Sequence, residues 1–171
     1  MAILKIRYAP DPILKQPTQP IPTVTAEIRR LAQDMVETMH AAGGVGLSAN
    51  QVGVPRQLFV ANHDHERGQE LIVLNPVIVT RRGRLRLEEG CLSLPGISAI
   101  VSRAAAVTIT GMTLDGKPCT LEGRELLARI FQHEIDHLNG TLFTDRISWL
   151  VRQRLVRRYQ RQQRELARVA R

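Results

Sequence analysis

The segment His133-Glu134-Ile135-Asp136-His137 constrains this chain more than any other, because its two histidines lie four positions apart. On an α-helix, side chains at i and i+4 project from the same face, so both imidazoles could hold one metal ion. Glu134 lies beside them, where its carboxylate could reach a water molecule activated by that metal. Two nitrogen ligands and a base are typical of metal-dependent hydrolases.

The residues around this segment predict a helix. Apolar residues recur near the helical period from Gly123 onward, and Glu125 lies in the first turn, where the helix dipole favours an acid. Asn139-Gly140 ends the pattern as a C-terminal cap would. A surface helix whose histidines fall four apart by chance is the alternative, and a third metal ligand would decide between the two.

The third ligand should lie upstream of the helix. Zinc proteases that use this helix often take a third ligand from downstream, as His or Glu. No histidine follows His137, and the only acidic residues after it are Asp145 and Glu165. Cys91 is therefore the best candidate.

Three motifs along the chain carry a family resemblance. They are Gly44-Val45-Gly46-Leu47-Ser48-Ala49-Asn50-Gln51, Glu89-Gly90-Cys91-Leu92-Ser93 and Gln132-His133-Glu134-Ile135-Asp136-His137. In this order they resemble the signature motifs of the peptide deformylase family, and the resemblance covers essentially the whole chain. It implies a hydrolase that removes the N-formyl group from the N-terminal methionine of nascent polypeptides and releases formate.

The resemblance also implies the roles of individual residues. Cys91, His133 and His137 would bind one divalent metal, and Glu134 would act as general base. The side-chain amide of Gln51 and the backbone N–H of Leu92 would stabilise the oxyanion. The implied substrate-binding residues are Gly44, Val45, Gly46, Leu47, Gly90 and Ile130. Fe(II) is the expected metal in the cell, with zinc, nickel or cobalt as substitutes, because this ligand set does not choose among them on geometry.

Three positions differ from many family members. Ser48 stands where alanine is common, and we expect little effect from this change. Arg129 replaces an apolar residue and should pair with a carboxylate or rim the substrate pocket. Ser98 stands where some relatives have arginine, so a clamp on the substrate backbone from that side is not expected here.

The rest of the chain predicts an α+β fold with mostly antiparallel sheets packed around the metal-binding helix. Residues 9–22 contain five prolines and should be irregular, and a helix should run from Ala26 to Ala41 with Thr25 as its N-cap. Asp115-Gly116 is a hairpin signal. Short strand-like runs cover residues 58–60, 71–74, 77–79, 107–110, 112–114 and 117–121.

Some features have simpler interpretations. Residues 44–53 could form a phosphate-binding loop, but they lack the Gly-Lys-Ser/Thr ending, and a structural turn is more consistent with the pattern alone. His63 and His65 lie in a polar loop and should be solvated. Cys119 should be a small buried residue on a hairpin.

The composition indicates a folded globular chain, with 43% hydrophobic and 23% charged residues. No apolar run is long enough to cross a bilayer, and the N-terminus does not resemble a signal peptide. Two distant cysteines fit a reducing cytoplasm. We expect a cytoplasmic monomer without a membrane partner.

The positive charge is confined to the C-terminal tail. Residues 146–171 contain nine arginines and one glutamate, which accounts for the whole net charge of +8. We expect a catalytic domain over 1–147 and a long basic helix over 148–171, anchored by Ile147, Leu150, Val151 and Leu155. One helix face should carry Arg154, Arg157, Arg161, Arg164, Arg168 and Arg171. Such a stripe is typical of contact with phosphate backbones, and the resemblance implies docking on the ribosome.

Two other functions compete with this hypothesis. A general metallopeptidase could use the same helix, although the missing downstream ligand and the Cys91 motif count against it. A ribosome-binding protein with a purely structural metal would need a fourth protein ligand, for which the sequence offers no strong candidate.

Overall fold

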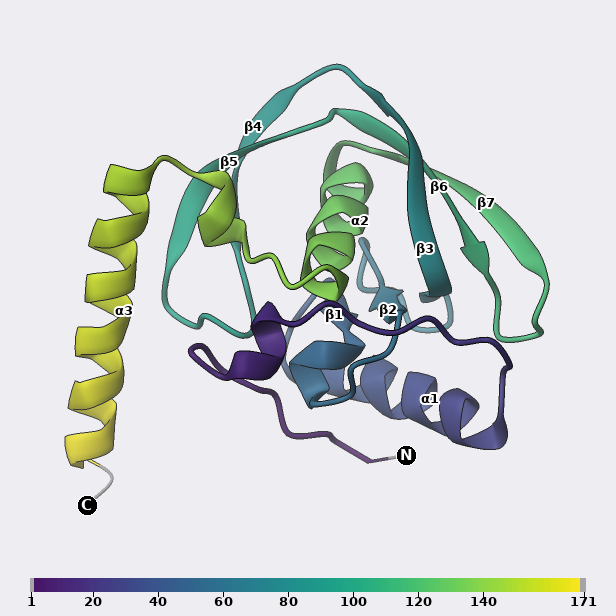
Figure 1. Ribbon diagram of the computed structural model, residues 1–171, viewed down its shortest axis with the longest axis horizontal. Coiled ribbons are helices and arrows are strands. Elements are labelled where there is room, and N and C mark those ends of the chain that lie inside the picture. Colours follow the sequence, from purple (N-terminus) through teal and green to yellow (C-terminus); the bar gives the residue numbers. More distant parts are fainter. Residues whose placement is uncertain (1, 170–171) are drawn as a thin grey trace.

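The computed structural model describes residues 2–169 and has an α+β fold, as predicted. The helix that carries the two histidines, α2 (Glu125–Leu138), lies at the centre of the fold (Figure 1). An antiparallel pair, β4 (Leu85–Gly90) and β5 (Ser98–Arg103), lies on one side of α2. The larger sheet lies on the other side, so α2 is enclosed by strands.

The larger sheet has five strands in the order β1-β2-β3-β6-β7, and every neighbouring pair is antiparallel. Its strands are β1 (Gly46–Ser48), β2 (Leu58–Ala61), β3 (Leu71–Arg82), β6 (Ala106–Met112) and β7 (Pro118–Arg124). The hairpin predicted at Asp115-Gly116 joins β6 to β7.

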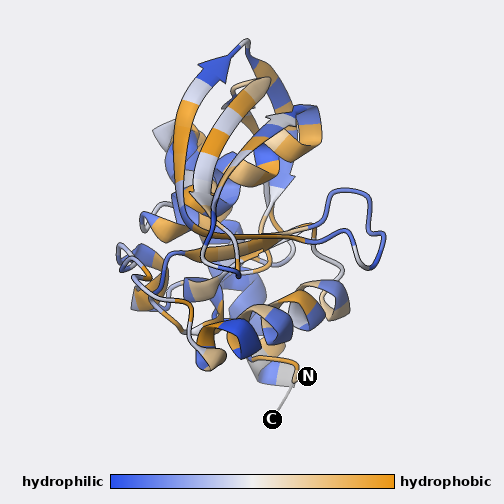
Figure 2. Cartoon of the chain, turned by 90° about the vertical axis from the view of Figure 1, so that its right-hand side faces the viewer, coloured by the Kyte–Doolittle hydropathy of each residue, from blue (hydrophilic) through white to orange (hydrophobic). Residues whose placement is uncertain are grey.

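Both faces of this sheet are covered by helices. Along β2, the side chains of Phe59 and Ala61 pack in the cluster that contains residues of α2. Leu58 and Val60 point to the other face, where they join Met35 and Met39 of the helix α1 (Ala26–Ala41). This alternation follows from the two-residue period of a strand. Figure 2 shows the resulting layer of hydrophobic strands in the middle of the molecule.

The predicted helices agree with the structure. α1 begins after Thr25, whose side chain accepts a hydrogen bond from the N–H of Ile28 at 3.3 Å. The proline-rich segment contains the 3-10 helix η1 (Pro12–Lys15) and two isolated β-bridges, and is otherwise irregular. α2 begins at Glu125 and ends before the C-cap Asn139, as its capping pattern predicts.

The strand predictions were less complete. β1, β4 and β5 were missed. The runs 71–74 and 77–79 are parts of one strand, β3, which continues through an irregularity between Leu74 and Val77. Asn75, at φ 50°, lies inside this irregularity, so a turn-like residue does not end the strand. Cys119 is half-buried on β7 and packs against the α2 cluster.

The predicted basic helix forms, but part of its predicted anchor is wrong. α3 spans Trp149–Val169. Leu150 and Val151 are 64% and 43% exposed, whereas Leu155 and the 4% exposed Tyr159 pack in a cluster with Phe143. Ile147 packs against the same cluster, so Ile147 and Leu155 are confirmed as anchor residues, whereas Leu150 and Val151 are wrong. The cluster of Phe143 in η3 (Phe143–Arg146) holds the helix on both sides of its exposed first turn.

The arginine stripe of α3 is exposed from Arg154 to Arg168, while Arg171 lies outside the described residues. Across residues 2–169 there is no helix with the length and hydropathy that a membrane-spanning segment needs.

Gly140 lies in the turn that follows α2, and Gly116, in the hairpin between β6 and β7, provides a control for its replacement. Gly140 has φ +70°, and a Cβ there would lie 2.6 Å from the carbonyl oxygen of Lys15. Gly116 has φ +75°, and a Cβ there would have no neighbouring atom within 4 Å. Gly116→Ala should cost about 1 kcal/mol for the left-handed conformation alone. Gly140→Ala should cost about 3 kcal/mol, because the backbone of residue 15 must also move. Urea unfolding of both variants measures the difference, and equal losses would contradict the predicted clash.

Candidate metal centre and substrate pocket

Three side chains from two parts of the fold converge on one point. His133 and His137 project from α2, and Cys91 follows β4. Sγ of Cys91 lies 3.1 Å from Nε2 of His137, which lies 3.2 Å from Nε2 of His133. The ligand atoms of the three residues all lie within 4.8 Å of one another. Ligands of one tetrahedral zinc-like ion would be about 3.3–3.6 Å apart, so this donor set fits a single metal.

Further contacts orient these donors. Nδ1 of His133 lies 2.6 Å from Oε1 of Glu89, so with the proton on Nδ1 the ring presents the lone pair of Nε2 to the centre. The thiol sulfur accepts from the N–H of Ser93 at 3.4 Å and from Nε2 of Gln51 at 3.6 Å. Burial lowers the pKa of His137, which favours the neutral ligand form.

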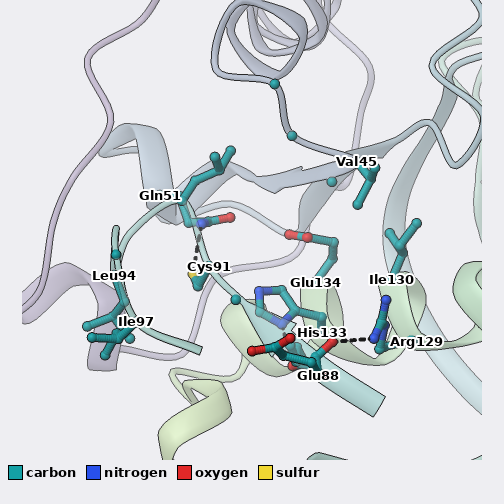
Figure 3. A pocket seen from close by; sticks show the side chains of 17 residues that line it. Val45, Gln51, Glu88, Cys91, Leu94, Ile97, Arg129, Ile130, His133 and Glu134 are labelled. Atoms are coloured by element: carbon teal, nitrogen blue, oxygen red, sulfur yellow. Dashed lines mark hydrogen bonds and ion pairs between the residues drawn. The ribbon is translucent and has the colours of Figure 1, made fainter. Parts of the chain in front are cut away.

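Glu134 lies beside the donors but points toward β1 (Figure 3). It is 3% exposed, and burial raises the pKa of its carboxyl group. The hydroxyl of Ser48 on β1 donates a hydrogen bond to Oε2 of Glu134. The family resemblance suggested that Ser48 is a near-neutral replacement for alanine, but this contact gives it a direct part in holding the carboxylate.

A chain of buried charges supports the far side of the centre. Arg103 on β5 donates to both carboxylate oxygens of Glu89, at 2.6 and 3.1 Å, and to Oδ2 of Asp136 at 2.5 Å. Arg146 also donates to Asp136. Burial opposes ionisation of Glu89, yet the bonds from His133 and Arg103 lower its pKa to about 2. Glu89 therefore stays ionised at neutral pH.

Glu89 and Asp136 lie within the family motifs, but their arginine partners, Arg103 and Arg146, lie outside them. Arg103 lies in Ser102-Arg103-Ala104-Ala105, which matches no motif, and its pairing requires β5 to lie beside α2. A singly placed arginine in an apolar stretch is the one signal that could have suggested a buried partner.

A pocket of about 360 Å³ opens onto the centre. Nearly all of the predicted site residues line it: Gly44, Val45, Gly46, Gln51, Gly90, Cys91, Leu92, Ile130, His133 and Glu134. Leu47 and His137 do not line it. In Figure 3, Leu94 and Ile97 lie on the side of the pocket opposite Val45 and Ile130.

The side chain of Leu47, one of the expected substrate-binding residues, lies away from the pocket. Its side chain is fully buried in the cluster with Met35 and Met39 of α1. The alternation of β1 explains this, because Gly46 and Ser48 face Glu134 and the residue between them must face away.

The other singled-out positions lie at the edge of the site or beyond it. Arg129 lines the pocket and donates from Nη1 to the backbone carbonyl of Glu88, so it rims the pocket and does not pair with a carboxylate there. Ser98 lies outside the lining and donates to the Glu88 carboxylate at 2.6 Å. His63 and His65 are exposed, as predicted.

Comparison with known proteins identifies the family. The sequence model of polypeptide deformylases matches residues 3–153. The peptide deformylase of Nitrosococcus oceani is 45% identical over 164 residues, covering 96% of this chain and 98% of the relative. That of Acidobacterium capsulatum is 45% identical over 166 residues, with the same coverage.

Solved structures agree with the sequence comparison. The peptide deformylase from Legionella pneumophila has a TM-score of 0.93 and 41% identity, covering 98% of this chain and 99% of that one. The Ehrlichia chaffeensis peptide deformylase in complex with actinonin has a TM-score of 0.88 and 36% identity, covering 96% and 99%. On its sequence, its fold and the residues of its site, the chain belongs to the peptide deformylase family.

Proposed function

We propose that this chain hydrolyses the N-formyl group of formyl-methionyl nascent peptides at a divalent metal held by Cys91, His133 and His137. The observation that carries the proposal is the convergence of these three donors beside the buried carboxylate of Glu134. The family match gives the reaction and its substrate class.

The chemistry that a bound divalent metal supplies is Lewis acidity, which activates water and the formyl carbonyl. We propose Fe(II) as the ion in the cell, with zinc, nickel or cobalt as substitutes. The thiolate neutralises one unit of the cation charge, and one sulfur donor with two imidazole nitrogens favours iron, zinc, nickel or cobalt over magnesium or calcium.

Glu134 acts as the proton carrier in this proposal. Its carboxylate takes a proton from the attacking water and later gives it to the departing amine of methionine. Its buried position raises its pKa toward the working pH, which suits both steps. Ser48 holds one carboxylate oxygen, which leaves the other oxygen available for the proton.

Gln51 and Leu92 stabilise the oxyanion in this proposal. The N–H of Ser48 donates to Oε1 of Gln51 at 2.9 Å, which fixes the orientation of the amide. Nε2 then faces Cys91 and the pocket. Leu92 lines the same pocket, and its backbone N–H is the second donor in this proposal. One such donor is typically worth about 3–4 kcal/mol in the transition state.

The methionine side chain enters the pocket near Val45 and Ile130, with the backbone of Gly44, Gly46 and Gly90 along its walls. The formyl carbon bears only hydrogen, so a site closed around the metal would exclude larger acyl groups. An N-acetyl-methionyl peptide should therefore react much more slowly than its formyl counterpart.

Formate release from formyl-Met-Ala-Ser tests the proposal, with protein purified without air and loaded with Fe(II) or Ni(II). We expect formate with no cleavage of internal peptide bonds, and loss of activity after chelation with recovery on metal return. Bound metal without formate release would mean that the substrate is wrong. Cleavage of internal bonds would favour the general metallopeptidase.

Gly46 offers a test of the position of Glu134. A Cβ on Gly46 would lie 2.4 Å from Oε1 of Glu134 and 2.9 Å from its Cδ. Gly46→Ala should displace the carboxylate and lower kcat by about 100-fold, because misplacement by about 1 Å carries a penalty of that size. Metal content measured on the same sample should not change, and an unaltered kcat would contradict the predicted displacement.

We also propose that residues 1–147 form the catalytic domain, that the chain acts as a monomer, and that the basic helix over 148–171 contacts the ribosome. The exposed arginines from Arg154 to Arg168 support an interaction with RNA phosphates. Replacing Arg157, Arg161 and Arg164 together by glutamine should weaken co-sedimentation with ribosomes and leave hydrolysis of a short peptide intact. Unchanged co-sedimentation at several salt concentrations would argue against the contact.

A further inference from the structure

The inward face of α3 packs against the loop that follows Cys91. Tyr159 lies in one hydrophobic cluster with Leu94 and Ile97, and Cys91 itself packs against that cluster. Leu94 and Ile97 line the substrate pocket on their other side. The tail helix is therefore separated from the pocket by one layer of side chains.

A second contact lies one turn further along α3. Gly96, between the two apolar residues of this wall, also lines the pocket and has φ +78°. A Cβ on Gly96 would meet the side-chain amide of Gln162, whose Nε2 and Oε1 would lie 2.4 and 2.8 Å away. Gln162 thus lies against Gly96 at a point where the loop has no side chain of its own.

A third connection runs through the N-terminal segment. The hydroxyl of Tyr159 donates to the carbonyl of Ala9 at 3.1 Å, and the N–H of Ala9 donates to the carbonyl of Ser93 at 3.0 Å. Oγ of Ser93 in turn accepts from Nε2 of Gln51 at 3.1 Å. Tyr159 therefore supports both ends of the loop, close to Ser93 and at the wall formed by residues 94–97.

We propose that Tyr159 and Gln162 are positioning residues for peptide binding, because they hold the pocket wall formed by Leu94, Gly96 and Ile97. The proposal rests on the proposed function of this pocket. It gives the inward face of the tail helix a part in supporting the pocket, in addition to the proposed ribosome contact of its arginine face. The arginine stripe points away from the body, whereas the face that carries these two residues belongs to the support of the substrate pocket.

The test compares full-length Gln162→Ala and Tyr159→Phe with Gln160→Ala, a matched control whose side chain is exposed. Tyr159→Phe keeps the ring and removes only the bond to Ala9, and Tyr159→Ala removes the ring as well. Circular dichroism and bound-metal measurements establish that each variant is folded and loaded. If Tyr159→Ala does not fold, the other two variants decide the question.

We expect KM for formyl-Met-Ala-Ser to rise about threefold to tenfold in Gln162→Ala and Tyr159→Ala, and less in Tyr159→Phe. The value of kcat should stay within about twofold, because the metal centre and Glu134 are not displaced. Calorimetric Kd values for the product peptide Met-Ala-Ser should rise by the same factor. Gln160→Ala should match the wild type in all three quantities.

Unchanged KM and product Kd in folded Gln162→Ala and Tyr159→Ala would overturn the proposal, as would an equal effect in Gln160→Ala. A general loss of stability would lower metal content and kcat, which the positioning role does not predict. If the wild type released no formate, the proposed function would fail. The product-binding measurement would still show whether these residues hold the pocket.

Discussion

Replacing Glu134 by glutamine should lower kcat for formate release by about 10²–10⁴-fold, the usual contribution of a general base. Glutamine has nearly the same shape and can still accept the hydrogen bond from Ser48. It cannot take up the proton of the attacking water. Because Glu134 is not among the three donor residues, metal content and the unfolding midpoint should stay close to those of the wild type.

Glu88→Gln provides the matched control for this prediction. Glu88 also lines the pocket, but its carboxylate is exposed and bonded to Ser98. A general loss of negative charge near the metal would affect both variants, whereas loss of the base affects only Glu134→Gln. Comparable kcat values for the two variants would assign the proton transfer to a group other than Glu134.

Replacing Arg103 by alanine should destabilise the protein by about 3–5 kcal/mol, the usual result of removing one partner from a buried ion pair. The side chain is 7% exposed and serves two carboxylates, Glu89 and Asp136. Within residues 2–169, its loss would leave the Glu89 side chain with His133 as its remaining partner, and that of Asp136 with Arg146. The orientation of His133 would then also be less well defined.

Arg81→Ala is the control for Arg103→Ala, because Arg81 is an exposed arginine on β3. We expect it to change the free energy of unfolding by less than about 0.5 kcal/mol. Both variants should be unfolded in urea with a chelator present, since bound metal would add its own stabilisation to the folded state. A loss below about 1 kcal/mol for Arg103→Ala would show that the carboxylates find water or other partners.

The helices could be predicted from the sequence because their information is local. Thr25 and Asn139 mark the ends of α1 and α2, and the apolar period between the caps identifies the buried faces. Because α2 is regular there, His133 and His137 lie on the same face of the helix, with their Nε2 atoms 3.2 Å apart. Cys91 could be singled out because no acceptable ligand follows α2.

The remaining features depend on contacts that no local pattern encodes. β1 is only three residues long and lies in a glycine-rich segment, so the sequence carries no strand signal for it. It is a strand because it pairs with β2. That strand also decides that Leu47 faces α1 and Ser48 faces Glu134. The anchor of α3 was misplaced because Leu150 and Tyr159 both fit an apolar face, and only the packed cluster selects between them.

The helical segment from His133 to His137 has a consequence for protein design. Its polar side chains have partners on β4, β1 and β5, through Glu89, Ser48 and Arg103. A pentapeptide grafted onto an unrelated helix would carry two imidazoles and leave all of these partners behind. We expect such a graft to bind metal loosely and to lack hydrolytic activity. Transferring this site to another protein would therefore require the helix together with the strands on either side of it.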